Sequence, residues 1–574
     1  MSTTAKTVSL LFLLLGCAAA QPVITGGPVN AASYAPLGLP NTGIAQGAMF
    51  VVFGRGLGPA SILTVNAFPL PTALGGTSIR VTVGGTTVGA IMIYTLARQV
   101  AAILPSNAPV GNGTLTITFG NQASAPVPVQ VVRSSFGTFS RNEAGSGPAI
   151  VQNFISQTDQ PLNTLVEAAQ PGQVVTLWGT GLSAVAGNES GGPLPGNLDA
   201  PVDVFVGNRA ANILYRGRSG CCAGVDQIVF EVPAGVEGCY VSVAVRAGGV
   251  VGNFTTMSVA SRGKVCADPT GLSISDLERA QSGGTMNIGD IALNRFAASF
   301  SLPGLGTLEG PVELAEGRFW RYGPRDLLAS ARGGLGGGVA GAPSIGSCTV
   351  SSFNFDDFLD SVYPNTSARS APRSLDAGPA LTVTGPRGTR RLPRQGSAST
   401  FFEYSSDGLL GGGIPGLPGL PPPQPTYLDP GSYTLDNGTG GADVGPFRAA
   451  LTIPSPLIWT NRNDISVIPR SQDLTLIWSG GGDREVVAIL GTSATPAAGV
   501  GARFICTERA GAGRFTVPAH VVSALPLSGS SEGVPIGFVM LGSTAAETNR
   551  FQAPGLDVGF FTYGLLYVKN VVYQ

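Results

Sequence analysis

Apolar and polar residues alternate along much of the chain with a period of two, which is typical of half-buried β-strands. Thr77–Val83 is the clearest case, because Ile79, Val81 and Val83 fall on one face. Thr114–Phe119 alternates in the same way. Such runs recur about every ten residues and are separated by turn residues, which favours a β-sandwich. The pattern therefore predicts an all-β protein.

One stretch of this pattern occurs twice. Val51–Leu57 reads Val-Val-Phe-Gly-Arg-Gly-Leu, and Val175–Leu182 reads Val-Thr-Leu-Trp-Gly-Thr-Gly-Leu. An apolar run that enters Gly-x-Gly-Leu predicts a strand that ends in a turn. Later strands repeat in the same order, with Gln99–Pro105 matched by Gln227–Pro233. The chain therefore contains an internal repeat of one β-rich unit.

The repeat divides the chain. We predict one sandwich at residues 22–133 and a second at 134–262. Residues 263–372 are predicted to be a connector. Its pattern is compatible with both helix and strand, so it could form a small α/β insert. Alternating runs at 373–574 predict a C-terminal β-rich domain of sandwich or jelly-roll type. The second copy differs from the first by an insertion, Arg216–Gly224.

The repeat resembles the IPT/TIG type of immunoglobulin-like domain over about residues 25–262. The resemblance rests on Gly-x-Gly-Leu, on Leu-Pro at 70–71 and 194–195, and on the Val-Asp-Val-Phe-Val-Gly strand at 202–207. Asn-Ala-Ala-Ser-Tyr at 30–34 and Gly-Cys-Cys-Ala-Gly-Val-Asp-Gln at 220–227 are similar to tandem pairs in exported acidobacterial proteins. The resemblance implies two immunoglobulin-like sandwiches that serve in adhesion, as spacers, beside catalytic domains or, in some transcription factors, in DNA binding.

The charge balance of the chain argues against DNA binding. Lys and Arg number 33 against 34 Asp and Glu, so the net charge is −1 and no basic surplus exists to bind a polyanion. Nucleic acid is therefore not an expected partner.

The N-terminus has the form of a secretory signal. Lys6 precedes the apolar run Val8–Leu15, and Ala18-Ala19-Ala20 offers a cleavage site before Gln21. An alternative is a lipoprotein signal, because Leu14-Leu15-Gly16-Cys17 resembles a lipobox and would anchor the protein through Cys17. The sequence has no later run of 18 or more apolar residues, so no membrane-spanning helix is predicted. We expect a secreted, cell-surface or periplasmic protein without a transmembrane span.

The cysteines agree with export. Seven cysteines become six once Cys17 leaves with the signal peptide, and an even number in an oxidising compartment predicts disulfides. We predict two bridges within the cluster Cys221, Cys222, Cys239 and Cys266, and one between Cys348 and Cys506. A bridge from the insertion to Cys239 is expected, because pairing of the adjacent Cys221 and Cys222 would distort the intervening peptide. Cys266 could tie back the exit of the second sandwich.

Familiar catalytic motifs are missing from the sequence. Neither Gly54–Gly56 nor Gly179–Gly181 completes a dinucleotide-binding Gly-x-Gly-x-x-Gly, so both are predicted to be structural turns. His520 is the single histidine and has apolar neighbours, which favours a packed residue over a catalytic one. No cofactor is expected.

Three groups of residues are weaker site candidates. Asp436, Asn437 and Asp443 lie on a glycine-rich loop and could bind calcium. Trp459 and Trp478 could form a sugar-binding platform, although tryptophan in a strand is more often part of a core. Paired carboxylates could support glycoside hydrolysis, and the candidates are Asp356, Asp357, Asp360, Asp429, Asp436 and Asp443.

Two functions follow from these observations. We expect a non-catalytic exported protein whose immunoglobulin-like modules act in surface interaction, adhesion or spacing, with an extracellular protein or glycan as partner. The alternative is a secreted carbohydrate-binding or carbohydrate-active protein that works through its C-terminal domain.

Overall fold

The structure is a computed structural model of the whole chain. It describes residues 21–267, 274–275, 278, 284–302, 306–323, 343–354, 373–397, 401–406, 409–414, 422–482, 485–531, 534–545 and 549–574. The expected signal peptide with Cys17, and the carboxylates Asp356, Asp357 and Asp360, lie outside these residues. No helix in the described part combines the length and hydrophobicity that a membrane crossing requires.

The protein is nearly all β, as predicted. The first sandwich is described without a gap and consists of two sheets. One sheet contains β1 (Val23–Ile24), β2 (Val29–Asn30), β4 (Met49–Arg55), β5 (Leu63–Thr64), β9 (Ile91–Leu96) and β10 (Gln99–Ile103). The other contains β3 (Ile44–Ala45), β6 (Ala73–Leu74), β7 (Thr77–Val83), β8 (Thr86–Gly89), β11 (Gly111–Phe119), β12 (Gln122–Ala123) and β13 (Val127–Val132).

The alternating pattern determines which side chains lie between these sheets. Ile79, Val81 and Val83 on β7 are buried, and they pack with Val52 and Val100 from the opposite sheet. Because side chains of a strand alternate between its faces, the polar residues between them face outward. The prediction from alternation is confirmed for this strand.

The second sandwich, also described without a gap, repeats this plan. Its first sheet contains β14 (Gly137–Thr138), β15 (Val151–Asn153), β16 (Val174–Thr180), β17 (Gly196–Asn197), β20 (Asn212–Arg218) and β21 (Asp226–Glu231). Its second contains β18 (Val202–Val206), β19 (Arg209–Ala210), β22 (Gly238–Ala247), β23 (Val250–Val251) and β24 (Thr255–Val259). The order β16-β21-β20 matches β4-β10-β9, and both β10–β9 and β21–β20 contain a register shift.

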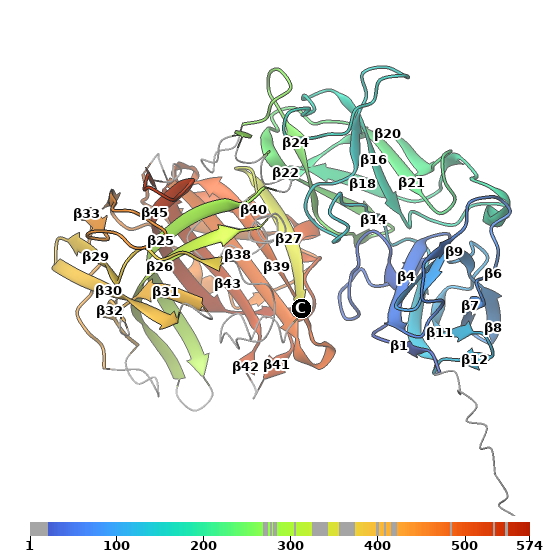
Figure 1. Cartoon of the computed structure of the whole chain (residues 1–574), viewed down its shortest axis with the longest axis horizontal. Helices are drawn as coiled ribbons and strands as arrows, with labels where there is room; N and C mark the ends of the chain where they lie inside the picture. Colours follow the sequence, from blue (N-terminus) through green and yellow to red (C-terminus); the bar gives the residue numbers. More distant parts are fainter. Residues whose placement is uncertain are drawn as a thin grey trace, which may run out of the picture.

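One large curved sheet dominates the C-terminal domain (Figure 1). Within the described residues its strands run β27-β39-β38-β43-β45-β25-β26-β31-β30-β29-β33-β34, and β28, β32 and β44 pair at its sides. Their bounds are β25 (Met286–Leu302), β26 (Gly306–Tyr322), β27 (Ser347–Asn354), β28 (Arg373–Ser374), β29 (Ala380–Gly385), β30 (Gly388–Ser397), β31 (Phe401–Ser405), β32 (Gly411–Gly412), β33 (Gly431–Asp436), β34 (Arg448–Ile453), β38 (Glu485–Thr495), β39 (Val500–Arg509), β43 (Gly537–Ala545), β44 (Asn549–Phe551) and β45 (Val558–Asn570).

Smaller elements complete this domain. A short sheet joins β35 (Ile458–Trp459), β37 (Leu474–Ser479) and β40 (Arg514–Val517), and two ladders pair β36 (Val467–Ile468) with β46 (Val572–Tyr573) and β41 (Ser530–Ser531) with β42 (Val534–Pro535). Helical turns occur at α4 (Ala519–Val522), η1 (Glu189–Gly191) in the second sandwich, η2 (Arg462–Asp464), η3 (Pro496–Ala498) and η4 (Ala510–Ala512).

The predicted connector at 263–372 is corrected by this topology. Strands β25, β26 and β27 come from that range and pair within the large sheet, so the sheet continues across residue 373. Strand β25 lies parallel to β45 near the C-terminus, with Ile288 opposite Val558. The pairing could not be read locally, because its partners lie more than 200 residues away in the sequence.

The hydrophobic core of the C-terminal domain extends into both sandwiches. Ala35 and Leu39 of the first sandwich, and Val251 and Phe254 of the second, belong to the same cluster of buried residues as the large sheet. Figure 1 shows both sandwiches on one side of that sheet. The three parts therefore share buried apolar surface, which is the main source of favourable free energy in packing.

The four clustered cysteines form two disulfides, as predicted, but the cysteines pair differently from the prediction. Cys348 on β27 bonds to Cys506 directly opposite on β39, as predicted. Cys239 bonds to Cys266, with Cα atoms 5.1 Å apart, and so ties back the exit of the second sandwich.

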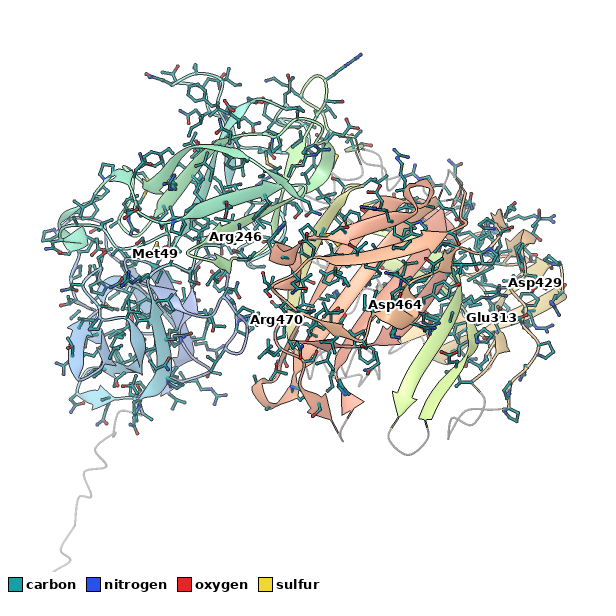
Figure 2. All side chains as sticks on the ribbon, turned by 180° about the vertical axis from the view of Figure 1, so that it is seen from behind. Met49, Arg246, Glu313, Asp429, Asp464 and Arg470 are labelled. Carbon is teal, nitrogen blue, oxygen red and sulfur yellow. A yellow bond between two sulfur atoms is a disulfide. The ribbon has the colours of Figure 1, made fainter. Side chains whose placement is uncertain are left out.

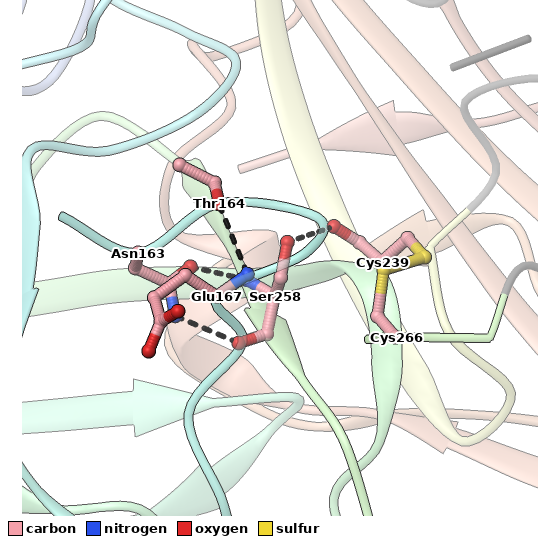
Figure 3. The surroundings of a disulfide bond; sticks show 6 residues. All are labelled: Asn163, Thr164, Glu167, Cys239, Ser258 and Cys266. Atoms are coloured by element: carbon pink, nitrogen blue, oxygen red, sulfur yellow. Dashed lines mark hydrogen bonds between the residues drawn. A yellow bond between two sulfur atoms is a disulfide. The ribbon is translucent and has the colours of Figure 1, made fainter. Parts of the chain in front are cut away.

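The expected bridge from the insertion to Cys239 is wrong, because Cys221 bonds to its neighbour Cys222. Cys239 is buried beside Leu165, Ala168 and Cys266, away from the insertion. In Figure 3, Ser258 donates to the Cys239 carbonyl at 3.0 Å and is itself held by Asn163. With Cys239 engaged there, Cys221 and Cys222 are left with each other as partners.

Loop length predicts how much two of these bridges stabilise the protein. The Cys348–Cys506 bridge joins residues 158 apart, so replacing both by Ala should lower the free energy of unfolding by about 4–5 kcal/mol. The same change at Cys221 and Cys222 releases a loop of minimal length and should cost about 1 kcal/mol. Urea unfolding of the two double variants checks this, and equal losses would contradict the loop-length account.

Candidate functional site

The predicted tryptophan platform is buried. Trp459 and Trp478 lie opposite each other on β35 and β37 and are 4% and 3% exposed. Their indole nitrogens donate inward, from Trp459 to Asn461 at 2.9 Å and from Trp478 to the Ala510 carbonyl at 2.7 Å. Neither ring offers a face to a sugar, so the platform is wrong and both residues belong to the core.

The predicted calcium ligands are occupied by the protein itself. Asn437 is buried, donates to the Ala377 and Gly445 carbonyls and accepts from the Phe447 amide. The Asp443 carboxylate accepts from the Asp376 amide at 2.9 Å, and the Asp436 carboxylate accepts from the Gly438 amide at 3.1 Å. Within the described residues no group of three His, Cys, Asp or Glu side chains could hold a metal. The loop is therefore held by internal hydrogen bonds, and the calcium candidate is not supported.

Asp429, the remaining described carboxylate of the predicted set, lies beside a buried glutamate that the sequence did not single out (Figure 2). Glu313 is fully buried and accepts from Arg295 at 2.7 Å and from the amides of Tyr427 and Leu428. Asp429 pairs with Arg387 at 2.5 Å. Each carboxylate is thus engaged by cations or amides, an arrangement that stabilises the loop at 427–429 rather than presenting an acid and a base to a substrate.

The most concentrated buried polar chemistry lies between the two sandwiches. The repeated turn Gly179–Leu182 wraps around the carboxylate of Asp226, which accepts from the amides of Gly181 and Leu182, both at 2.8 Å. Arg218 lies 3.2 Å from the same carboxylate, and both side chains are buried. Burial raises the pKa of Asp226 to about 6, against the opposing effects of Arg218 and the two amides. The Gly-x-Gly turn therefore binds an internal anion in the second sandwich.

Arg218 also connects the two sandwiches. Its guanidinium donates to the Gly47 carbonyl of the first sandwich at 2.9 Å and to the Ser183 carbonyl at 3.1 Å. A side chain at Gly47 would place its Cβ atom 2.5 Å from Arg218, and Gly47 has a φ of +73°. Only glycine allows this close approach without strain.

Asn30 and Thr180 extend the contact. Asn30 donates to the carbonyls of Ser135 and Thr180, both at 3.2 Å, and accepts from the Ala32 amide at 2.9 Å. The Thr180 hydroxyl accepts from the Met49 amide at 2.8 Å and donates to the Gly224 carbonyl at 2.6 Å. Figure 2 places Met49 where the two sandwiches meet. We call the set Asn30, Gly47, Thr180, Arg218 and Asp226 the first junction.

The insertion of the second copy belongs to this junction. Ala223 packs with Leu70, Ile91 and Ile103 of the first sandwich. Beside it, the Cys221–Cys222 bridge is exposed at the tip of the insertion. The insertion therefore has a structural role, which is to fill the space against the β9–β10 sheet.

A second junction joins the second sandwich to the C-terminal domain and consists of Phe205, Arg246, Phe254 and His520. The rings of Phe205 and His520 stack with centroids 3.8 Å apart and planes 4° apart, and Phe254 lies on the same histidine at 6.5 Å. The Arg246 guanidinium lies over the Phe205 ring, 5.5 Å from its centroid. Burial, reinforced by Arg246, lowers the pKa of His520 to about 4, so the ring is neutral at pH 7. His520 is a packed residue rather than a catalytic one.

A small cavity of about 190 Å³ lies where all three parts meet, lined by Tyr34, Asn253, Ser351 and Arg503 among others. Arg503 donates to the Ser351 hydroxyl at 3.3 Å, and burial lowers its pKa. This contact joins β39 to β27 within the large sheet, on the C-terminal side of the cavity.

The sequence contained partial signals for these residues. Asn30 and Asp226 occur in the motifs Asn-Ala-Ala-Ser-Tyr and Gly-Cys-Cys-Ala-Gly-Val-Asp-Gln, and Arg218 lies in the insertion. Nothing in the sequence predicted that the three would meet, since they come from positions up to 196 residues apart, from Asn30 to Asp226.

Comparison with known proteins does not assign the chain to a family. No protein-family model matches the chain, and no curated protein matches it. Among solved structures it is similar to Gamma-CGTase from alkalophilic Bacillus clarkii, with 10% identity over 49% of this chain and 35% of the other, and a TM-score of 0.16. The chain thus spans about a third of that protein.

Two further structures match along most of the chain. One is the Bacteroides ovatus protein SGBP-B in complex with a mixed-linkage heptasaccharide, with 10% identity over 87% of this chain and 92% of that one, and a TM-score of 0.12. The other is Sidekick-1 immunoglobulin domains 1–4, with 10% identity over 94% and 98%, and a TM-score of 0.10. Likeness at this level carries no functional weight, and the fold assignment rests on the strand pairing above.

The first junction predicts a large effect for loss of one charge. Asp226→Asn leaves the buried guanidinium of Arg218 without its counter-charge and should lower the free energy of unfolding by about 3–5 kcal/mol. Calorimetry of the full chain measures this. The matched control is Glu167→Gln, which removes the exposed ion pair with Lys264 and should cost far less, because solvent screens exposed pairs. A loss at Asp226 no larger than at Glu167 would contradict the assigned role.

The second junction predicts a dependence on pH. Folding lowers the pKa of His520 from 6.5, so as the pH falls the histidine is protonated in the unfolded chain before it is protonated in the folded protein. The stability contributed by the neutral ring is complete above about pH 6.5 and is lost as the pH falls toward 4. His520→Phe keeps a ring against Phe205 but does not titrate. Melting temperatures of wild type and variant should diverge below pH 6.5, and parallel curves would refute the assignment.

Proposed function

We propose that this protein is an exported, non-catalytic scaffold in which two immunoglobulin-like sandwiches hold the large C-terminal sheet in a fixed orientation for surface interaction. The observation that carries the proposal is the first junction, where several hydrogen bonds cross between the sandwiches and one of them comes from Arg218, a member of a buried ion pair in the second sandwich. Modules that move independently do not need such contacts, because they are joined by exposed linkers and few contacts cross from one module to the next.

The second junction supports the same reading. Phe205 and His520 stack across the boundary, and apolar residues of both sandwiches join the core of the C-terminal domain. Interfaces of this kind resist relative motion of domains, because opening them exposes apolar and polar groups that lack partners.

Export fits the cysteine chemistry. The described residues contain three disulfides, and such bonds persist in oxidising compartments. We propose cleavage after Ala20, with lipid attachment at Cys17 as the alternative, and kinship of the two sandwiches with the IPT/TIG domains of exported acidobacterial proteins. An extracellular protein or glycan is the proposed partner.

Small-angle scattering of the full-length mature protein tests the scaffold. The profile should fit one compact arrangement of the three parts, with a bell-shaped Kratky plot. Asp226→Asn combined with His520→Ala should broaden the distance distribution. The first change releases Arg218, which donates to Gly47 of the first sandwich, and the second removes the ring stacked on Phe205. Glu167→Gln is the control and should leave the profile unchanged. A wild-type profile that requires freely moving domains would overturn the proposal.

A further inference from the structure

A cleft of about 770 Å³ opens between the two sandwiches, beside the first junction. It is lined by Ser134 and Ser135, which link the two sandwiches, and by Arg133 of the first sandwich and Asp199 of the second. This whole region belongs to 21–267, which is described without a gap. The volume lies within the range of about 300–1,000 Å³ that is usual for small-molecule sites.

Polar side chains without protein partners line this cleft. In the described chain, the side chains of Gln130, Arg133 and Asp199 make no hydrogen bond or ion pair. Gln46 differs, because its amide nitrogen donates to the Ala108 carbonyl at 2.7 Å, which leaves its oxygen as an oriented acceptor. The cleft therefore offers a guanidinium, two carboxamides and a carboxylate to a ligand.

The walls are held in place from behind. Gly47, next to Gln46, accepts from Arg218, and Ser183, which lines the cleft, accepts from the same guanidinium. A ligand would bind between surfaces that are already ordered, so little ordering entropy would be lost. In this respect the inference rests on the proposed scaffold.

The chemistry of the walls selects among ligand classes. One Arg and one Asp give no net charge, which does not suit a polyanion. Of the strands that border the cleft, β3 and β23 have two residues each, and β13 is already paired with β11 on one side and with β3 at Val131 and Val132 on the other. Little strand edge is therefore left beside the cleft for an extended peptide to add to. Apolar Val132 and Val250 lie among the polar groups. Hydroxyl-binding groups beside apolar surface match a ligand with hydroxyls on its edges and C–H groups on its faces.

We propose that this cleft binds a neutral oligosaccharide. Arg133, from the first sandwich, donates to sugar hydroxyls, and Asp199, from the second sandwich, accepts from them. Gln46 and Gln130 supply hydrogen bonds that can donate or accept, as hydroxyls do. Val132 and Val250 pack on the C–H faces of the ring.

Isothermal titration of the full-length protein with cello-, manno-, xylo- and malto-hexaose tests the proposal. At least one hexaose should bind at one site. Arg133→Ala and Asp199→Asn should each weaken that binding at least tenfold. The matched controls Arg80→Ala and Asp159→Asn change exposed residues outside the cleft and should leave the affinity unchanged.

Three results would overturn the proposal. They are the absence of binding by all four hexaoses at millimolar concentration, binding that persists in both cleft variants, and preferential binding of an acidic oligogalacturonide or a peptide. Scattering profiles of the same variants should match the wild type, because neither residue belongs to a junction. Loss of sugar binding in a variant whose scattering profile is unchanged is therefore the result expected for the cleft. Free movement of the domains in the wild-type protein would instead refute the scaffold.

Discussion

The buried ion pair between Arg218 and Asp226 is the interaction on which the arrangement of the two sandwiches depends. Removing a carboxylate and a guanidinium from water is costly, and the cost is offset only when both meet partners in good geometry. Asp226 finds the amides of the Gly179–Leu182 turn, and Arg218 finds a carbonyl of the other sandwich. Since one set of partners belongs to each sandwich, the pair can be satisfied in one relative orientation.

The other features of the molecule follow from that orientation. The insertion beside Arg218 places Ala223 on the first sandwich, and the linking residues Ser134 and Ser135 line a cleft between the two sandwiches. On the far side, the second sandwich presents Phe205 to His520, and its apolar residues enter the core of the large sheet. A buried polar contact thus fixes the relative orientation of the sandwiches, and shared apolar packing joins them to the large sheet.

The candidate sites that failed did so for a common reason. Tryptophans, acidic loops and paired carboxylates are used by proteins both for binding and for internal structure, and composition does not distinguish the two. Trp459 and Trp478 are buried, Asn437 satisfies backbone groups of its own loop, and Asp429 is paired with arginine. The vicinal Cys221–Cys222 bond was missed because the position of Cys239 beside Cys266 is a property of the folded sandwich.

The sequence by itself determined the all-β class, the internal repeat, the buried face of strands such as β7, and the Cys348–Cys506 bridge. The first three depend on alternation and short-range turns, which are local, whereas the bridge followed from the cysteine count once the other four cysteines formed a cluster in the sequence. Only the tertiary structure decided that β25 pairs with β45, that Asn30, Arg218 and Asp226 meet, and that Arg133 and Asp199 line one cleft. Such contacts join segments far apart in the chain, and their free energy depends on burial and geometry that no local pattern records.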